Sequence, residues 1–473
     1  MSAKVESYEQ AVEFLFNRVN FERLSGHQYS NSDFKLDRMR ELLRLLGNPQ
    51  QALPVVHIAG TKGKGSTAAL TAAILTAAGI RVGLFTSPHI SAFEERIAVN
   101  GACPSADELV ELVRQIAEVV NELDKLPGQM SPTYFEIATA LAWLFFREQR
   151  AELAVLEVGM GGRLDSTNVC CPAVSMITTI SRDHTRQLGS RVEQIAREKA
   201  GIIKPSVPVV SGVADEAARN VIVETCQRLG APLTQLGTDF QYRYQPARIG
   251  NDQMSPAMAD ILLPQHHWQN LRLPLVGEHQ ARNLALAAMA VECLREQGWN
   301  IPRDAVPAGL GRLRWPGRIE ILGQNPTVIV DAAHNWEAVA ALLRTLSESF
   351  QARRRVLIFA ATRDKDVTGM LRQLLPRFDT IILTCFQSNP RHVPVEALAE
   401  TVQGLTDRLC HRTADAASAW KLARRLAAPT DLICATGSFF LAAELRELII
   451  DSLRTGEAEL PSDSLPNRSS VGL

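Results

Sequence analysis

A glycine-rich segment, Gly60-Thr61-Lys62-Gly63-Lys64-Gly65-Ser66, lies between an apolar run at 54–59 and a helical pattern that begins at Ser66. This order predicts a strand, a phosphate-binding loop and a helix. Glycines let backbone amides converge on a phosphate, Lys64 adds a fixed positive charge, and a helix N-terminus at Ser66 favours anions. The segment predicts binding of a nucleoside triphosphate, although Gly65 stands where the strict motif has Ser or Thr. A glycine-rich turn with solvated lysines is the alternative.

Composition restricts the partners of the chain. Its 473 residues are enough for two or three domains with apolar cores. The 50 Lys and Arg residues balance 51 Asp and Glu residues, which argues against a surface that coats nucleic acid or anchors to a membrane. The eight cysteines show no CxxC spacing, so neither a zinc site nor a disulfide framework is indicated. Without a signal segment or a run of transmembrane length, we expect a reducing, cytoplasmic location.

Short apolar runs alternate with longer helical patterns along most of the chain. This alternation predicts an α/β fold with mostly parallel sheets and helices on both faces. We expect a doubly wound N-terminal domain of the P-loop type at residues 1–317 and a smaller Rossmann-like C-terminal α/β domain at 318–455. Residues 456–473 are expected to form a disordered tail. The runs predicted as strands are 53–59, 80–85, 153–158, 173–180, 207–211, 327–330, 355–360, 380–384 and 431–435.

Polar residues follow several of these runs directly. The glycine loop, Ser87, Glu157 and His184 each come after a different predicted strand. In open α/β sheets ligands bind outside the carboxyl ends of the strands, so these segments point to one crevice. A bound triphosphate needs magnesium, and these three side chains are candidate ligands by position. Taken singly, they could be a helix cap, an ordinary strand-end acid and a hydrogen-bonded core histidine.

Two segments look irregular. Residues 24–34 are polar and dotted with aromatics between helical patterns at 7–18 and 37–46, which predicts a mobile loop. Residues 240–275 predict peripheral strands and loops. The pair His266-His267 in that segment could bind a metal, but without acidic or sulfur partners nearby a solvated loop is favoured.

A set of motifs then appears in order from about residue 7 to about residue 450. Together they resemble the folylpolyglutamate synthase/dihydrofolate synthase family of the Mur ligase superfamily. The resemblance implies an ATP-dependent ligase that adds L-glutamate to dihydropteroate, to reduced folyl-glutamates, or to both, through an acyl phosphate. The motifs are His57–Ser66, Thr86–His89, Glu94–Ile97, Thr133–Glu136, Glu157–Asp165, Glu198–Ile202 and Asp331–Asn335.

The same resemblance implies roles for individual residues. ATP would be clamped between the domains, with two Mg²⁺ ions beside it. Lys64, His184 and Lys199 would take part in catalysis, and Lys199 stands at a position that is carbamylated in relatives. ATP contacts are implied for Lys62, Gly63, Lys64, Gly65, Ser66, Asn283, Arg318 and Asp331. Metal contacts are implied for Ser87, Glu157, His184 and carbamylated Lys199. Pteroate contacts are implied for Phe34, Lys35, Leu36, Thr133, Tyr134, Phe135, Glu136, Leu164, Asp165 and Ser166.

Some positions depart from the family pattern, and some alternatives stay open. Lys62 stands where Asn is common, Ala332 where Gly is usual, and Arg191 where Thr is usual. Lys199 could instead be a helix lysine paired with Glu193 or Glu198. The other functional hypotheses are a Mur-type ligase acting on a cell-wall UDP-sugar peptide and a nucleotide-binding module without turnover. The expected partners are small molecules only, without nucleic acid or membrane, and the resemblance implies a monomer.

Overall fold

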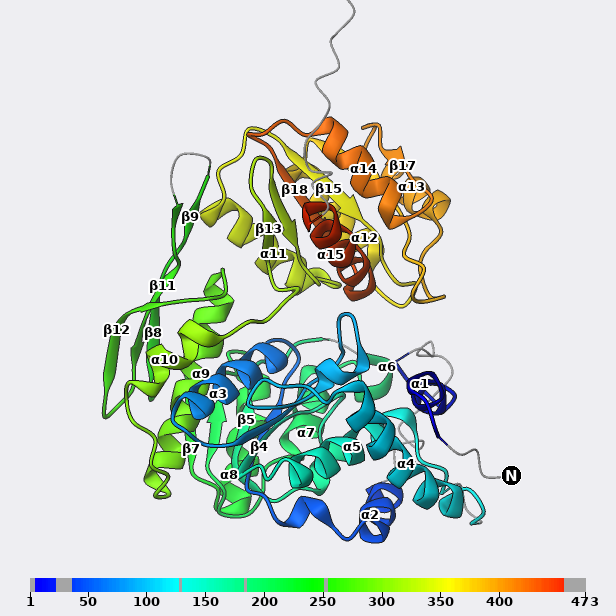
Figure 1. Ribbon diagram of the computed structural model, residues 1–473. Helices are drawn as coiled ribbons and strands as arrows, with labels where there is room; N and C mark the ends of the chain where they lie inside the picture. The colour runs from blue at the N-terminus through cyan, green and yellow to red at the C-terminus, as the bar shows by residue number, and fades with distance from the viewer. Residues whose placement is uncertain (1–4, 23–35, 127–129, 183–184, 251–253, 455–473) are drawn as a thin grey trace, which may run out of the picture.

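The computed structural model shows two large sheets, each covered by helices, and two smaller sheets (Figure 1). Strands and helices follow the predicted alternation, so the predicted α/β class is confirmed. None of the described helices is long and apolar enough to cross a membrane. The structure describes residues 5–22, 36–126, 130–182, 185–250 and 254–454.

The N-terminal sheet has seven strands. These are β1 (Val55–Ala59), β2 (Val82–Phe85), β3 (Ile97–Val99), β4 (Leu153–Glu157), β5 (Pro172–Ile177), β6 (Val209–Ser211) and β7 (Leu233–Gln235). Their order is β3-β2-β4-β1-β5-β6-β7, and β3 alone runs antiparallel to its neighbour. β1 therefore lies at the centre, with Ile58 beside Glu157 of β4. This register brings the glycine loop and Glu157 to the same edge of the sheet.

Helices cover both faces of this sheet because the side chains of β1 alternate between two cores. Val56 and Ile58 pack in a core with α3 and α9, whereas Val55 packs in a core with α4 and α5. The helices of this part are α1 (Tyr8–Phe16), α2 (Leu36–Leu45), α3 (Lys64–Ala77), α4 (Ala106–Leu123), α5 (Tyr134–Glu148), α6 (Thr185–Leu188), α7 (Val192–Ala200), α8 (Glu216–Leu229), α9 (Glu278–Glu296) and α10 (Ala305–Arg312).

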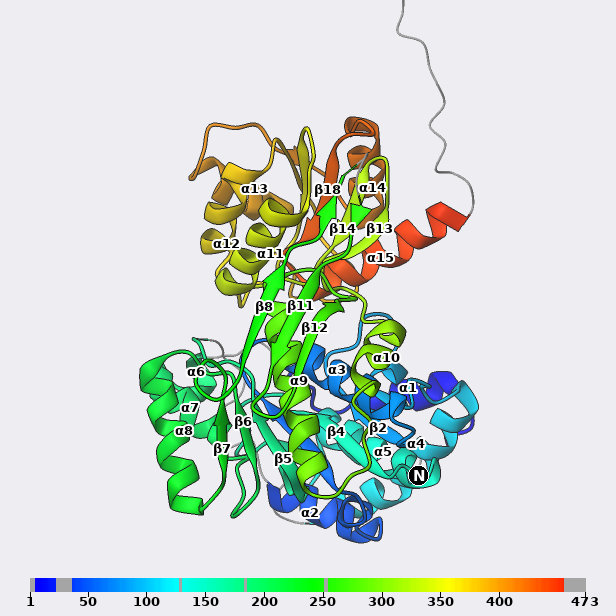
Figure 2. The same ribbon diagram turned by 90° about the vertical axis from the view of Figure 1, so that its left-hand side faces the viewer.

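The segment 240–275 forms antiparallel strands, as predicted for a peripheral region. β8 (Gln241–Gln245), β11 (Met258–Leu262) and β12 (His267–Arg272) make a three-stranded sheet that packs on α9. β9 (Arg248–Ile249) and β10 (Met254–Ser255) form a short ladder beside it. Figure 2 shows these strands extending from α9 toward the C-terminal sheet. In that direction the Gln351 amide donates to the Ile249 carbonyl at 2.9 Å.

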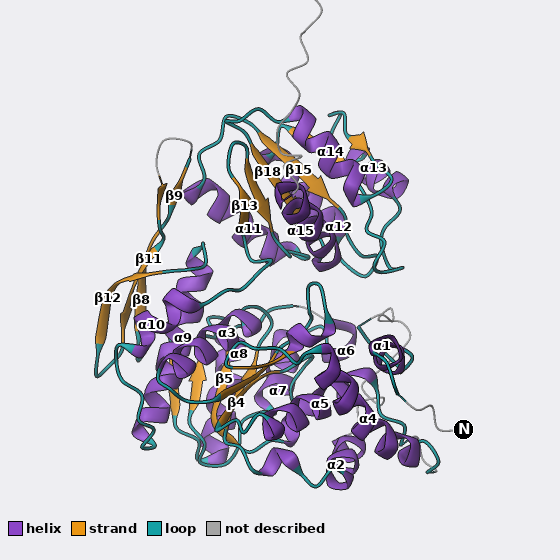
Figure 3. Ribbon diagram, in the orientation of Figure 1, coloured by secondary structure: helices purple, strands orange, loops and turns teal. Residues whose placement is uncertain are grey.

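The C-terminal sheet has six strands in the order β13-β14-β18-β15-β16-β17, with β13 antiparallel. Figure 3 shows this sheet among its helices. Its strands are β13 (Glu320–Gly323), β14 (Thr327–Val330), β15 (Arg355–Phe359), β16 (Thr380–Leu383), β17 (His411–Arg412) and β18 (Leu432–Thr436). Its helices are α11 (Trp336–Ser349), α12 (Val367–Leu374), α13 (Val395–Gln403), α14 (Ala416–Leu426) and α15 (Phe439–Arg454). The predicted tail at 456–473 lies outside the described residues.

Candidate active site

The glycine loop connects β1 to α3 and depends on glycine geometry. Gly60 has φ +153° and Gly63 has φ +84°, which L-residues with side chains rarely adopt. A Cβ atom at Gly63 would stand 2.5 Å from Asn283 Oδ1, so the loop backbone lies directly against α9. Gly63 is also the N-cap residue of α3 and has no side chain to cap the first turn. The first amides of α3 can therefore bind an anion.

The end of β5 fixes the loop from the other side. Thr178 Oγ1 donates to the Lys62 carbonyl at 2.7 Å, and the Lys62 amide donates to Thr179 Oγ1 at 2.9 Å. The Thr61 amide donates to the Thr179 carbonyl at 2.7 Å. The Lys62 ammonium itself lies 3.5 Å from His334 Nε2 of the C-terminal part. The loop is thus rigidly attached to the sheet, while one of its side chains contacts the segment after β14.

Three residues predicted from strand ends meet at this edge. Lys64 Nζ lies 3.8 Å from Glu157 Oε1, and the Ser87 amide donates to Glu157 Oε2 at 3.0 Å. Burial raises the pKa of the Glu157 carboxyl, while Lys64, the Ser87 amide, Arg318 and Arg96 oppose that shift. A buried carboxylate beside a hydroxyl-bearing residue and a phosphate loop fits a hard cation that keeps waters and phosphate oxygens as ligands.

The described part of the chain contains no group of three or more His, Cys, Asp and Glu side chains that could hold a metal by themselves. His184, a predicted ligand, lies outside the described residues. Ser87 and Glu157 alone would supply only part of the coordination sphere of a metal ion. Phosphate oxygens and waters would have to complete it, as is usual for magnesium at nucleotides.

Lys199 reaches the same place from α7. It is 4% exposed, and its Nζ donates to the Gly60 carbonyl at 2.8 Å. Glu193 and Glu198 are instead paired with Arg191 and Arg163, at 3.0 and 2.9 Å. In this structure the two acids of the alternative pairing thus contact arginines. Lys199 and Lys64 line one hollow of about 20 Å³ with Gly60, Thr61, Val158, Gly159, Met160, Gly161 and Leu188.

The other predicted nucleotide contacts come from α9 and from the start of the C-terminal part. Asn283 is buried beside Gly63 and donates through Nδ2 to Gln280 Oε1 at 3.0 Å. Asp331 accepts the amides of Ile319 and Ala333, both at 2.9 Å. The Arg318 guanidinium lies 5.4 Å from the centre of the Phe439 ring. Burial lowers the pKa of Arg318, against the attraction of Asp331 and Glu157.

The predicted pteroate segment at the start of α5 has structural contacts of its own. Thr133 caps α5, and its amide and hydroxyl donate to Glu136 Oε2 at 2.7 and 2.8 Å. Arg38 of α2 donates to both oxygens of Glu136, at 2.9 and 2.7 Å. Tyr134 is fully buried. Phe135 is partly exposed, and its ring would stand 2.5 Å from a Cβ atom at Gly159. Of these four side chains, Phe135 is the one that faces the glycine segment after β4.

The remaining predicted pteroate residues belong to two segments, 34–36 and 164–166. Phe34 and Lys35 lie outside the described residues, and Leu36 is partly buried at the start of α2. Leu164 is also partly buried. Asp165 accepts the Met160 amide at 3.0 Å, and the Ser166 hydroxyl lies 2.6 Å from that of Thr139. Asp165 and Ser166 thus hold the turn that follows Glu157.

Two neighbours of the loop escaped sequence reasoning. Trp315 Cζ2 would stand 3.2 Å from a Cβ atom at Gly65, so the indole packs on the first turn of α3. The Thr67 hydroxyl is buried without a hydrogen-bond partner among the described residues. For Trp315, the available signal was its position three residues before the predicted domain boundary at residue 318. Thr67 gave no signal, because only the turn of α3 shows that its hydroxyl is inaccessible to solvent.

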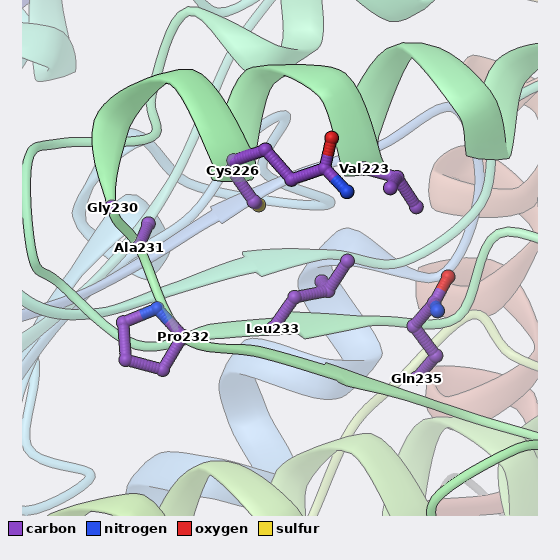
Figure 4. A pocket seen from close by; sticks show the side chains of 8 residues that line it. Val223, Cys226, Gly230, Ala231, Pro232, Leu233 and Gln235 are labelled. Carbon is purple, nitrogen blue, oxygen red and sulfur yellow. The ribbon is translucent and has the colours of Figure 1, made fainter.

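Three other features lie apart from this site. Arg191 is exposed and pairs with Glu193, so nothing in the structure explains its departure from the family pattern. His266 packs edge-on against Trp268, with ring centres 4.4 Å apart. A hollow of about 380 Å³ lies between α8 and β7 (Figure 4), lined by Val223, Cys226, Gln227, Gly230, Ala231, Pro232, Leu233 and Gln235. None of its lining residues carries a charge, which makes it unsuited to ATP.

A phosphate loop at the carboxyl edge of one α/β sheet, next to a second α/β sheet, is the arrangement expected of a nucleotide-dependent enzyme with two α/β domains. The Mur ligase middle domain matches residues 58–291, and the Mur ligase, glutamate ligase domain matches residues 317–439. The chain is 38% identical to the dihydrofolate synthase/folylpolyglutamate synthase of Bacillus subtilis, over 78% of this chain and 83% of that protein.

Solved structures agree with this relationship. A Mycobacterium tuberculosis folylpolyglutamate synthase complexed with ADP has a TM-score of 0.84 and 34% identity, covering 94% of this chain and 99% of its own. An Escherichia coli structure in complex with DHPP and ADP has a TM-score of 0.79 and 29% identity, with 95% and 99% coverage. The chain belongs to the dihydrofolate synthase/folylpolyglutamate synthase family. It is an ATP-dependent ligase that joins an acid to an amino acid in folate glutamylation.

Proposed function

We propose that this one chain adds L-glutamate both to dihydropteroate and to reduced folyl-glutamates. The observation that carries the proposal is the meeting of Lys64, Glu157 and Lys199 around the glycine loop. Both activities need the same phosphoryl transfer, because both substrates present a carboxylate to the γ-phosphate of ATP. The Bacillus subtilis relative bears both names, which supports two activities in one chain.

The chemistry follows from the weak reactivity of a carboxylate toward amines. Transfer of the γ-phosphoryl group onto the substrate carboxylate gives an acyl phosphate and ADP. The L-glutamate amine attacks the acyl carbon, and inorganic phosphate leaves. Lys64 would stabilise the charge on the transferring group from a fixed position, where electrostatic stabilisation is most effective. Exclusion of water by the C-terminal part would protect the acyl phosphate from hydrolysis.

The nucleotide would lie along the loop and under the start of the C-terminal part. The ADP held by the Mycobacterium tuberculosis relative supports this proposal. The close approach of Asn283 to Gly63 and the burial of Asp331 near Arg318 favour contacts on both sides of the nucleotide. The proposed ATP contacts are Lys62, Gly63, Lys64, Gly65, Ser66, Asn283, Arg318 and Asp331.

Two Mg²⁺ ions are proposed. Ser87 and Glu157 would hold one, and His184 and carbamylated Lys199 would hold the other. When bound, they would supply positive charge to the phosphate oxygens during transfer. Support for carbamylation of Lys199 comes from its burial beside a backbone carbonyl and a second lysine. A neutral amine can react with CO₂, and the resulting carbamate offers oxygen ligands to a hard cation.

The pteroyl substrate is proposed to bind between the segment around residues 34–36, the start of α5 and the turn at 164–166. Phe135 supports this, since its partly exposed ring faces the glycine segment that leads to that turn. We also propose a domain boundary near residue 318, a monomeric enzyme and a cytoplasmic location. The ranges matched by the two Mur ligase domains, 58–291 and 317–439, support the boundary.

The deciding experiment offers purified protein ATP, Mg²⁺ and L-glutamate with dihydropteroate or a reduced folate monoglutamate in separate reactions. Ligated products are identified by mass. We expect a one-glutamate mass increase with each acceptor. Product from the folate but not from dihydropteroate would reduce the function to polyglutamate synthesis. A UDP-sugar peptide as a third acceptor tests the cell-wall alternative and should give no product. Nucleotide binding without any product would favour the non-catalytic module.

A further inference from the structure

A chain of hydrogen bonds runs through the interior from β1 to the turn after β4. His57 Nε2 lies 2.9 Å from Thr167 Oγ1, and Thr167 Oγ1 lies 2.6 Å from Asp165 Oδ1. Asp165 Oδ2 accepts the Met160 amide at 3.0 Å. On the other side of the imidazole, Cys170 Sγ lies 3.5 Å from His57 Nδ1. His57 and Thr167 have no exposed surface, and Asp165 is nearly buried.

The chemistry of the members fixes the direction of each bond. Asp165 accepts the Thr167 hydroxyl and the amides of Thr167 and Met160, and these bonds oppose the rise in pKa that burial causes, which favours a carboxylate that acts as an acceptor. Thr167 has one hydroxyl proton and gives it to Asp165, so this hydroxyl can only accept from His57. His57 must therefore carry its proton on Nε2, which leaves Nδ1 to accept from the Cys170 thiol.

Burial keeps the His57 imidazole and the Cys170 thiol neutral. It lowers the pKa of His57 to about 3, with the charge of Lys204 adding to the effect, and it raises the pKa of the Cys170 thiol to about 12. A protonated imidazole would lose its acceptor nitrogen and the bond from the thiol. The donor direction from His57 to Asp165 is thus maintained over the ordinary range of pH.

Both ends of this chain belong to the two segments that line the active-site hollow. His57 lies in β1, three residues before Gly60, whose carbonyl accepts from Lys199. At the other end, the Met160 amide is tied to Asp165, and Gly159, Met160 and Gly161 line the hollow with Lys64 and Lys199. The hydrogen bonds therefore connect β1 to the glycine turn, in addition to the β1–β4 ladder and the bond from the Val158 amide to the Ile58 carbonyl.

We propose that His57 and Thr167 are positioning residues of the ligase, which hold the turn at 159–165 against the phosphate loop through Asp165. The inference rests on the proposed ligase function. Neither side chain contacts the reacting groups, because both are enclosed by protein. Their effect is on where Lys199, the glycine turn and Glu157 stand relative to Lys64. A displacement of about 1 Å in such a site can lower the rate about a hundredfold.

The test compares Thr167→Val, which keeps the shape but loses the hydroxyl, with Thr167→Ser, which keeps the hydroxyl. We expect Thr167→Val to lower kcat about tenfold to a hundredfold with little change in KM for ATP. Thr167→Ser should restore most of the rate. The matched control is Thr225→Val in α8, since Thr225 is also buried and also donates a hydroxyl bond, to the Val221 carbonyl at 2.7 Å. This control should lose stability without losing kcat.

A second measurement reports on the hydrogen bonds of His57 directly and does not depend on turnover. Nitrogen-15 NMR of histidine-labelled enzyme, with the His57 signals assigned by their loss in His57→Gln, should show a neutral Nε2–H imidazole from pH 5 to 8. Thr167→Val should shift the Nε2 signal. A His57 that protonates in this range, or that carries its proton on Nδ1, overturns the proposal.

The kinetic outcomes separate the positioning role from the ligase function. Unchanged kcat in Thr167→Val, failure of Thr167→Ser to rescue, or an equal loss in Thr225→Val would each overturn the positioning role in an otherwise active ligase. A wild-type protein that forms no ligated product with any acceptor would instead overturn the proposed function.

Discussion

Lys64 is the residue of the glycine loop whose positive charge we expect to act on the phosphate. It stands 3.8 Å from Glu157 at the first position of α3 and is largely enclosed. We expect Lys64→Ala to abolish ligation, because loss of such a charge costs about 3 kcal/mol or more of transition-state stabilisation. The chain should still fold, but the melting temperature should fall, because the buried Glu157 carboxylate loses its nearest cation. Near-normal turnover of Lys64→Ala, in steady-state assays beside the exposed control Lys421→Ala, would contradict the ATP-site assignment.

Lys199 allows a chemical test of its modification. Lys199→Ala should lose ligation that bicarbonate cannot restore, whereas a small carboxylate such as acetate should restore part of it by supplying the missing oxygen ligand. Independently, wild-type enzyme equilibrated with ¹³CO₂ should show a carbamate carbon signal by NMR that is absent in Lys199→Ala. Full activity of the variant without additives, or an enzyme with no carbamate signal, would show that the bare amine is the working form.

His57 also predicts how stability depends on pH. Its pKa is lowered from 6.5 to about 3, so between these values the unfolded chain binds a proton that the folded chain does not. Its contribution to stability is complete above pH 6.5 and is lost as the pH falls toward 3. The slope is about 1.4 kcal/mol per pH unit. Urea unfolding of wild type and His57→Gln should therefore differ increasingly with pH between 4 and 6.5, whereas the exposed-site variant His411→Gln should run parallel to wild type.

At the scale of elements, the start of α5 combines a helix cap with an ion pair to α2. Arg38 and Glu136 are both buried and lie 2.7 Å apart. Arg38→Met leaves the Glu136 carboxylate without its cation, so we expect a loss of about 3 to 5 kcal/mol in the free energy of unfolding. The double variant Arg38→Met/Glu136→Gln should recover part of that loss.

Helix α2, which carries Arg38, also provides the control for this prediction. Arg40 pairs with Asp37 at 2.9 Å, but both side chains are mostly exposed, so Arg40→Met should cost about 0.5 kcal/mol or less. Thermal unfolding and KM for the pteroyl substrate are measured on all variants. If Arg38→Met changes KM but not stability, Glu136 contributes to binding of the pteroyl substrate more than to the stability of α5.

Much of this architecture could be predicted from the sequence, because buried parallel strands such as β1 and β4 are continuous apolar runs that end in polar motifs. The short strands β3, β7, β13 and β17 were not predicted, since two to four residues at the edge of a sheet carry too little pattern. The strand-end placement of Glu157 and Ser87 followed from topology alone. The role of Glu136 as partner of Arg38 did not, because the two are 98 residues apart and only packing joins them.

At the scale of the whole molecule, the two parts of the chain touch around the loop at several points. Ser181 hydrogen-bonds to Glu337 of α11, and Lys62 lies 3.5 Å from His334. Trp315 stands in the connection between α10 and β13 and packs on Gly65. Because Trp315 lies in this connection, we expect a shift of the C-terminal sheet to move the indole relative to the phosphate loop. Trp315 would then couple the position of the second sheet to the geometry of the nucleotide site.

This coupling predicts that Trp315 reports nucleotide binding by fluorescence. The chain has six tryptophans, and Trp315 packs on Gly65 of the glycine loop. ADP should change the emission of wild type, and Trp315→Phe should remove most of that change, because the indole packs beside Gly65 of the phosphate loop. Trp299→Phe, in the connection between α9 and α10, should leave it intact. Trp315→Ala should also raise KM for ATP about tenfold, equivalent to about 1.4 kcal/mol, since it removes the wall behind Gly65. An ADP response that survives in Trp315→Phe, together with unchanged KM in Trp315→Ala, would mean that the linker does not sense the nucleotide and that the two sheets move independently of it.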